Sequence, residues 1–216
     1  MQTPEVREQM IEQQVRAWDV LDERVLDVMR EVPRELFVPE ELRYRAYADL
    51  EVPLPCGQHM LRPSVAGRLL QALMPAGDEA VLEIGAGSGF LTACLRVMSA
   101  NVRSLEVFPE LAAMARRNLA SIGLHDVEVI DADALAGPSA ARYAAIAVTA
   151  AFPLYDARFE RQLAVGGRLF VVVGEPPVMQ ARLVRRTAEE AWTTTSLFET
   201  VIDPLVNAAR PPRFTF

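Results

Sequence analysis

Hydrophobic residues recur at helical spacing through the first third of the chain. Before Pro33 they lie three or four positions apart, which predicts two helices, and Asp22 is a suitable N-cap for the second. The hydrophobic positions of the first predicted helix are Met10, Ile11, Val15 and Trp18. Residues 47–63 contain several prolines and few helix signals, so we expect a loop there, and helical spacing returns from Ser64 to Met74.

From Ala80 onward short apolar runs alternate with helical segments. The apolar runs, which we expect to form strands, cover residues 80–84, 102–107, 127–130, 144–148 and 168–173. The helical segments between them cover residues 91–98, 110–122 and 159–163. This alternation predicts a mostly parallel sheet with helices on both faces. Two further stretches, Ala181–Thr187 and Thr194–Ile202, predict an antiparallel C-terminal hairpin at the sheet edge, with a turn at residues 189–192.

We therefore predict an α/β fold of the Rossmann-like kind in one integrated domain. Residues 1–79 would form an N-terminal helical extension that carries a substrate loop, and residues 80–216 would form the ligand-binding core. The total length of 216 residues fits a single domain with such an appendage.

The charged residues and cysteines exclude several kinds of chemistry. All 22 basic residues are Arg, so no phosphate-binding or Schiff-base lysine exists, and the net charge of −7 argues against a nucleic-acid partner. No uncharged stretch approaches the ~18 apolar residues of a membrane span, and the N-terminus lacks a signal-peptide pattern, so we expect a cytoplasmic protein with no membrane partner. Cys56 and Cys94 have neither disulfide nor metal-ligand spacing, and we expect no metal.

A glycine-rich segment lies where the first core strand meets a helix. Glu83, Gly85, Gly87 and Gly89 give the pattern E-x-G-x-G-x-G, in which glycine lets the backbone turn sharply and approach a ligand. We therefore expect a ligand at the carboxyl end of this strand, beside the N-terminus of the helix. The dinucleotide fingerprint has its third glycine five residues after the first, where this chain has Phe90, so the spacing argues against NAD.

Two further acidic residues follow the next strands. Glu106 ends the second strand, where a carboxylate can accept from both hydroxyls of a ribose, and Asp133 follows the third, near the place of an adenine amino group. With the glycines, this set resembles the class I S-adenosylmethionine-dependent methyltransferases, which implies S-adenosylmethionine as the cofactor. The residues that the resemblance assigns to the cofactor are Glu83, Gly85, Ala86, Gly87, Gly89, Phe90, Glu106, Val107, Asp133 and Ala134.

Flanking segments narrow the resemblance to one family. They are Val32–Arg34, Phe37–Pro39, Ala46–Asp49, Gly57–Gln58 with Pro63, Val148–Ala151, Gln162–Leu163 and Gly166–Gly167. In order and approximate spacing, from about Arg7 to about Gly174, they look like the protein-L-isoaspartate O-methyltransferase family. This resemblance implies an enzyme that moves a methyl group from S-adenosylmethionine to the free α-carboxylate of isoaspartyl residues. Damaged proteins or peptides that contain isoaspartyl residues would be its substrates.

One loop departs from the family pattern. The family reads Gln-Thr-Ile-Ser-x-Pro, with the serine regarded as an active-site residue, whereas this chain reads Gln58-His59-Met60-Leu61-Arg62-Pro63. Leu61, at the position of the serine, cannot donate a hydrogen bond to an acceptor carboxylate, and His59 or Arg62 could hold that carboxylate instead. By resemblance the segment from Gln58 to Arg62 forms the acceptor site, with His59 as the catalytic candidate.

The altered loop leaves three functions open. The first is carboxyl methylation of isoaspartyl proteins or peptides, and the second is methyl transfer to a different acceptor on the same fold. The third is a non-catalytic module that binds S-adenosylmethionine and uses the loop to bind a protein.

Overall fold

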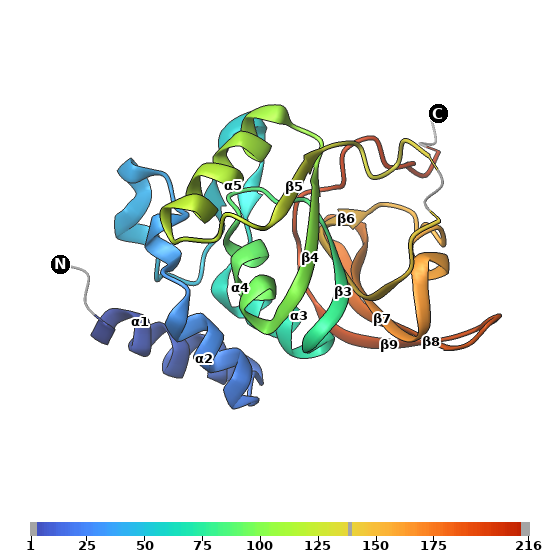
Figure 1. The fold of residues 1–216 in the computed structure, drawn as a ribbon, viewed down its shortest axis with the longest axis horizontal. Coiled ribbons are helices and arrows are strands. Elements are labelled where there is room, and N and C mark those ends of the chain that lie inside the picture. The colour runs from blue at the N-terminus through green and yellow to red at the C-terminus, as the bar shows by residue number, and fades with distance from the viewer. Residues whose placement is uncertain (1–3, 138–139, 213–216) are drawn as a thin grey trace.

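The structure, a computed structural model, describes residues 4–137 and 140–212 (Figure 1). Its N-terminal part is helical, as the hydrophobic spacing predicts, although the first predicted helix changes from α to π and then to 3-10 geometry. The elements up to residue 73 are α1 (Pro4–Met10), a π turn (Ile11–Val15), 3-10 turns at Arg16–Trp18, Arg34–Leu36, Glu40–Arg45 and Pro55–Gly57, α2 (Glu23–Glu31), β1 (Val52–Pro53), β2 (His59–Met60) and α3 (Pro63–Leu73). The predicted cap is confirmed, because the Asp22 side chain accepts from the backbone N–H of Arg24 at the start of α2.

A seven-stranded sheet forms the centre of the molecule, in the order β5-β4-β3-β6-β7-β8-β9 (Figure 1). The first five strands in this order run parallel, whereas β8 and β9 add antiparallel strands at one edge. The strands are β3 (Gly77–Ile84), β4 (Ser99–Glu106), β5 (Glu128–Asp131), β6 (Tyr143–Phe152), β7 (Leu163–Glu175), β8 (Val178–Ala188) and β9 (Ala191–Glu199), and the helices among them are α4 (Phe90–Met98) and α5 (Pro109–Ser121). The predicted fold class is confirmed: an α/β fold of Rossmann-like topology with a mostly parallel sheet and an antiparallel C-terminal edge.

The C-terminal hairpin is tighter than its sequence suggests. Its turn contains only residues 189–190, because Trp192 already belongs to β9, where its indole N–H donates to the Glu160 carbonyl at 3.0 Å. The strand ends at Glu199 rather than at Ile202, since the residues after it leave the sheet and turn over the carboxyl ends of the parallel strands. The predicted bounds of this pair are therefore corrected at both ends.

The two faces of the sheet are covered differently. The core on one face takes residues from α2, α3, α4 and α5. Among the described residues, the core on the other face contains none from an α-helix and is closed instead by Phe159, Trp192 and Leu205 from turns, the hairpin and the C-terminal segment. The expected helical cover of both faces is thus wrong for this second face. The helix expected at residues 159–163 is a single 3-10 turn at Glu160–Gln162, because Leu163 already begins β7.

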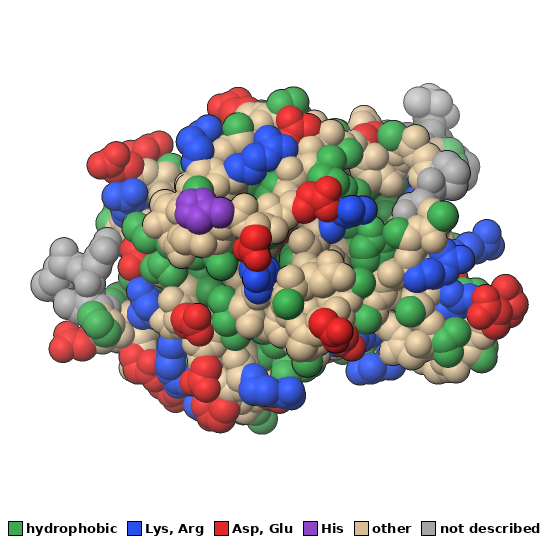
Figure 2. Space-filling view, in the orientation of Figure 1, with side chains coloured by type: hydrophobic (Ala, Val, Ile, Leu, Met, Phe, Trp, Pro, Cys, Tyr) green, Lys and Arg blue, Asp and Glu red, His purple; other side chains and the backbone are tan. Residues whose placement is uncertain are grey.

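The N-terminal extension packs directly on the core of the sheet domain. Phe37 meets Phe90 edge-on with ring centroids 5.8 Å apart, and Trp18 meets Phe198 at 6.1 Å. One continuous hydrophobic cluster contains residues from both regions. We propose on this basis that the described residues of the two predicted regions, 1–79 and 80–216, form one integrated domain. The boundary between them falls inside β3, which begins at Gly77. On the face drawn in Figure 2, acidic and basic side chains are interspersed. Within residues 4–137 and 140–212 no helix is long and apolar enough to cross a membrane.

Candidate active site

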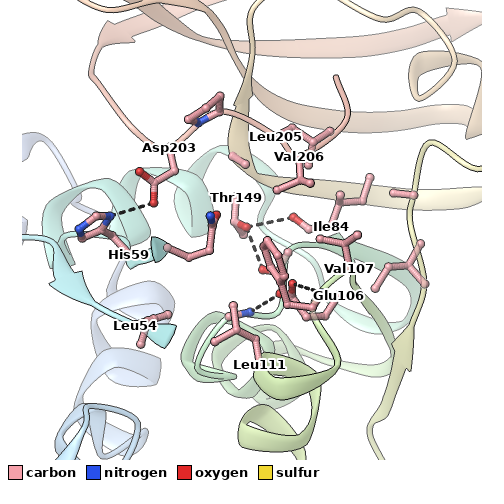
Figure 3. A pocket seen from close by; sticks show the side chains of 18 of the residues that line it. Leu54, His59, Ile84, Glu106, Val107, Leu111, Thr149, Asp203, Leu205 and Val206 are labelled. Carbon is pink, nitrogen blue, oxygen red and sulfur yellow. Dashed lines mark hydrogen bonds and ion pairs between the residues drawn. The ribbon is translucent and has the colours of Figure 1, made fainter. Parts of the chain in front are cut away.

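A cleft with about 720 Å³ of empty space opens at the carboxyl ends of β3, β4 and β6 (Figure 3). Its walls come from the glycine loop after β3, the end of β4, the loop after β5, residues 51–61 and residues 202–206. A smaller cavity of about 380 Å³ adjoins it. The residues shared by the two cavities are Leu54, His59, Leu61, Gly85, Gly87 and Thr149. The combined size suits a ligand of cofactor dimensions.

A threonine on the neighbouring strand β6 packs against the backbone of the glycine loop. The Thr149 hydroxyl lies against the carbonyls of Ile84 (3.0 Å) and Gly85 (2.8 Å), to which it can donate. Gly85 has a φ of +92°, and a Cβ at this position would come within 2.3 Å of the Thr149 hydroxyl oxygen. Only glycine fits here, and the bare backbone of the loop lines the cleft.

Glu106 is the acidic group most firmly built into the site. Its side chain is buried, and its two carboxylate oxygens accept from the backbone N–H of Gly87 at 2.9 Å and of Phe108 at 3.1 Å. These two donors fix the carboxylate in the wall of the cleft. An ionised carboxylate has about four acceptor sites, so each oxygen can still accept from a ligand hydroxyl.

Asp133 and its neighbour Ala134 line the same cleft, as the sequence predicts. One oxygen of Asp133 accepts from the backbone N–H of Leu135 at 2.8 Å, and the other accepts from the side-chain amide of Asn207 at 2.9 Å. Asn207 belongs to the C-terminal segment, which sequence reasoning left without a role.

Two residues expected to contact the cofactor line neither cavity. Glu83 is fully buried and accepts from the hydroxyls of Thr92 and Ser104, the latter at 2.6 Å. Burial raises the pKa of this carboxyl to about 8. Gly89 lies at the N-cap of α4 with a φ of +88°. Both support the glycine loop from outside the cavities, whereas Ala86, Val107 and Phe90 do line one cavity or the other.

The predicted acceptor loop is only partly exposed to the cleft. Gln58, His59 and Leu61 line the large cavity, and Met60 lines the small one. Arg62 lines neither: it donates to the Thr200 hydroxyl at 3.2 Å, and its guanidinium lies 5.8 Å from the Trp18 ring centroid. Arg62 is therefore a less suitable carboxylate ligand than sequence reasoning allowed.

A buried arginine fixes the position of Leu61. Arg34 donates to the Leu61 carbonyl at 2.7 Å and to the Ala46 carbonyl at 2.9 Å. Burial lowers the pKa of this guanidinium to about 10. The leucine side chain is thereby held in the wall of both cavities, where it supplies an apolar surface.

Residues 202–206 form a wall of the cleft that sequence reasoning missed. The backbone N–H of Ala151 donates to the Asp203 carbonyl at 2.8 Å, and the N–H of Leu205 donates to the Ala151 carbonyl at 2.7 Å. The Asp203 carboxylate meets Nδ1 of His59 at 3.0 Å (Figure 3). The segment has no periodic pattern that would have assigned it to the site, and only the parallel pairing with the end of β6 places it there.

Other reactive side chains contribute less. Glu51 lines the cleft half-buried, and burial raises the pKa of its carboxyl against the opposing effect of Arg62. Cys56 is exposed with its thiol 3.7 Å from Glu110, and Cys94 is buried. The described residues contain no cluster of three or more His, Cys, Asp or Glu side chains suited to a metal ion.

The parallel sheet, the glycine loop and the acidic residues after β4 and β5 together define a class I methyltransferase fold. The family model for protein-L-isoaspartate(D-aspartate) O-methyltransferase (PCMT) matches residues 5–210, and the chain belongs to this family.

Relatives of known name match most of the chain. Protein-L-isoaspartate O-methyltransferase 2 of Marinobacter nauticus is 40% identical over 204 residues, which is 94% of this chain and 93% of that protein. The enzyme named protein-L-isoaspartate O-methyltransferase from Synechococcus sp. is 40% identical over 207 residues, 93% of this chain and 85% of that one. A Plasmodium falciparum PCMT crystallised with S-adenosyl-L-homocysteine superimposes with a TM-score of 0.79, covering 92% of this chain and 97% of that chain at 18% identity, which shows the shared fold.

Proposed function

We propose that this protein transfers a methyl group from S-adenosylmethionine to the free α-carboxylate of L-isoaspartyl residues in damaged proteins and peptides. The observation that carries the proposal is the family match over residues 5–210, combined with a single cleft where the glycine loop and Glu106 adjoin the loop of the expected acceptor site. Such a repair enzyme would act in the cytoplasm, and the two free cysteines agree with a reducing compartment.

The residues of the cleft fit S-adenosylmethionine. Glu106 offers acceptors to the ribose hydroxyls, and Asp133 offers acceptors to the adenine amino group. Gly85 and Gly87 line the cleft with bare backbone. Apolar side chains complete the walls: Leu54, Leu105, Val107, Leu111 and Leu205. When bound there, S-adenosylmethionine supplies a methyl group on a positively charged sulfonium.

The remaining task of the chain is to position the acceptor and exclude water. A carboxylate is ionised near neutral pH and is its own nucleophile, so no general base is required. Leu54, Leu61 and Phe90 line the smaller cavity with apolar surface. Such a surface strengthens the attraction between the carboxylate and the sulfonium, and a fixed geometry makes their encounter effectively intramolecular.

A methyltransferase with a different acceptor is the second candidate, and Leu61 is the observation that favours it. The leucine offers no hydrogen bond at the position where the family has a serine. The half-buried Glu51 adds a carboxylate that would repel an anionic acceptor.

Transfer of labelled methyl groups to an isoaspartyl peptide tests the proposal, with the matching aspartyl peptide as the control. Calorimetric titration with S-adenosylmethionine is run in parallel. Base-labile labelling of the isoaspartyl peptide alone would support repair methylation. Cofactor binding without transfer to either peptide would refute it, and would favour another acceptor or a binding-only role.

A further inference from the structure

A histidine and an aspartate meet across the mouth of the cleft. His59 lies in β2, in the wall formed by residues 51–61, whereas Asp203 lies in the segment after β9. Nδ1 of the imidazole is 3.0 Å from the Asp203 carboxylate (Figure 3). Both side chains are partly exposed, at 38% and 27%, so a ligand can reach them. The contact links two walls of the cleft that are 144 residues apart in the chain.

The donors at this end of the cleft are few. The Thr149 hydroxyl is directed at the carbonyls of the glycine loop, and the Gln58 amide donates to the Cys56 carbonyl at 3.4 Å. Glu51 and Asp203 are carboxylates, which accept when ionised. Of the described side chains that line the large cavity, only His59 can therefore carry a positive charge, and its Nε2 has no hydrogen-bond partner.

The two protonation states of the imidazole behave differently toward an acceptor carboxylate. A neutral ring that donates from Nδ1 to Asp203 has a lone pair on Nε2, which would repel a carboxylate. A protonated ring donates from both nitrogens, one bond to Asp203 and one to the acceptor. Asp203 on one side and an acceptor carboxylate on the other are both hydrogen-bond acceptors, so only a ring that donates from both nitrogens can bond to both.

We propose that Asp203 is a positioning residue for acceptor binding, which orients His59 so that in the complex the ring donates Nδ1–H to Asp203 and Nε2–H to the α-carboxylate of the isoaspartyl residue. The pair replaces the neutral hydroxyl that is missing at Leu61 with a charged donor. This inference rests on the proposed function and assigns it a residue far from the acceptor loop in sequence.

Steady-state kinetics of Asp203→Asn tests the role in binding. Asparagine keeps an oxygen that can accept from Nδ1 but removes the charge, and the backbone bonds of Asp203 to Ala151 stay in place. We expect KM for the isoaspartyl peptide to rise by about tenfold or more, in line with the loss of a charge-assisted hydrogen bond, while the Kd for S-adenosylmethionine stays within twofold.

Glu51→Gln is the matched control, because it removes one negative charge from the same cleft, and Glu51 has no hydrogen bond to His59. Its KM for the peptide should fall, because the variant removes a carboxylate that repels an anionic acceptor. An equal rise of KM in both variants would refute the specific role of Asp203, because it would show that only the total charge of the cleft matters. An unchanged KM in Asp203→Asn would also overturn the proposal.

Nitrogen-15 NMR of the histidine side chains tests the protonation of the ring. The chain has two histidines, His59 and His125, and His125 lies outside both cavities, so it is an internal control. In the complex of wild-type protein with S-adenosylhomocysteine and isoaspartyl peptide we expect both nitrogens of His59 to be protonated. In Asp203→Asn this signature should be lost while His125 is unchanged.

The two measurements separate failure of the inference from failure of the proposed function. A wild-type protein that methylates no isoaspartyl peptide would refute the proposed function, and with it the acceptor role of the pair, even if the NMR signal of His59 depends on Asp203. Active wild-type protein whose His59 signal does not change in Asp203→Asn would refute the inference alone.

Discussion

Replacing Glu106 by glutamine tests whether this carboxylate binds the cofactor. The residue is 4% exposed, and its carboxylate oxygens accept from the N–H groups of Gly87 and Phe108. Glutamine preserves the size of the side chain but replaces one accepting oxygen with an NH₂ group, which cannot accept. In either orientation of the amide, a backbone N–H or a ligand hydroxyl therefore loses an acceptor. The loss of one hydrogen bond to a charged group costs about 1.5–3 kcal/mol. At 1.4 kcal/mol per factor of ten, we expect S-adenosylmethionine to bind roughly 10- to 100-fold more weakly.

Isothermal titration calorimetry measures this change, and circular dichroism confirms that the variant is folded. Glu128→Gln is the matched control, because this exposed carboxylate pairs with Arg103 at the start of β5, outside both cavities. Its Kd should equal that of the wild type. A folded Glu106→Gln variant that binds the cofactor within twofold of the wild type would refute the assignment of Glu106 to the ribose.

Three further predictions concern stability. Gly85→Ala should lower the free energy of unfolding by about 2 kcal/mol or more in urea titrations, because the position combines a positive φ with a clash against Thr149. Gly123→Ala, at φ +82° but with open space around the added Cβ, should lower it by only about 1 kcal/mol, and equal losses in the two variants would contradict the clash. Burial raises the pKa of the Glu83 carboxyl from 4.5 to about 8, so between these pH values the folded state binds more protons than the unfolded state, and stability should fall as pH rises. Thermal melts of Glu83→Gln should show a flatter pH dependence than those of the wild type, and an unchanged slope would refute the raised pKa. Arg168→Met should lower the free energy of unfolding by about 3 kcal/mol or more in urea titrations, because the buried guanidinium donates to carbonyls at the C-terminal end of α3 and pairs with Glu79. A loss below about 1 kcal/mol would show that the protein does not depend on this network.

Local patterns in the sequence were sufficient to predict the cofactor side of the candidate site. Gly85, Glu106 and Asp133 each follow a strand closely, and the carboxyl ends of neighbouring parallel strands meet at one edge of the sheet. These three residues come close together because of the order of strands and helices along the chain. The glycine spacing and the two acidic residues therefore predicted the walls of one cleft. Their roles in binding stay predictions until the variants are measured.

The position of Glu83 depended on the tertiary structure. The central strand β3 is buried on both faces, so its sequence has no polar and apolar alternation to show which way the carboxyl is directed. The packing of α4 decides it, because Thr92 on that helix and Ser104 on β4 enclose the carboxyl below the glycine loop.

The acceptor side shows the same division between sequence and tertiary structure. The altered loop with Leu61 and His59 was visible in the sequence, because it departs from a pattern within a few consecutive residues. The contact of His59 with Asp203 and of Asp133 with Asn207 was not visible, because the C-terminal segment carries no periodicity and reaches the cleft only by pairing with the end of β6. Sequence determines what is encoded by spacing within one element, whereas contacts between residues far apart in the chain exist only once the sheet has brought their backbones together.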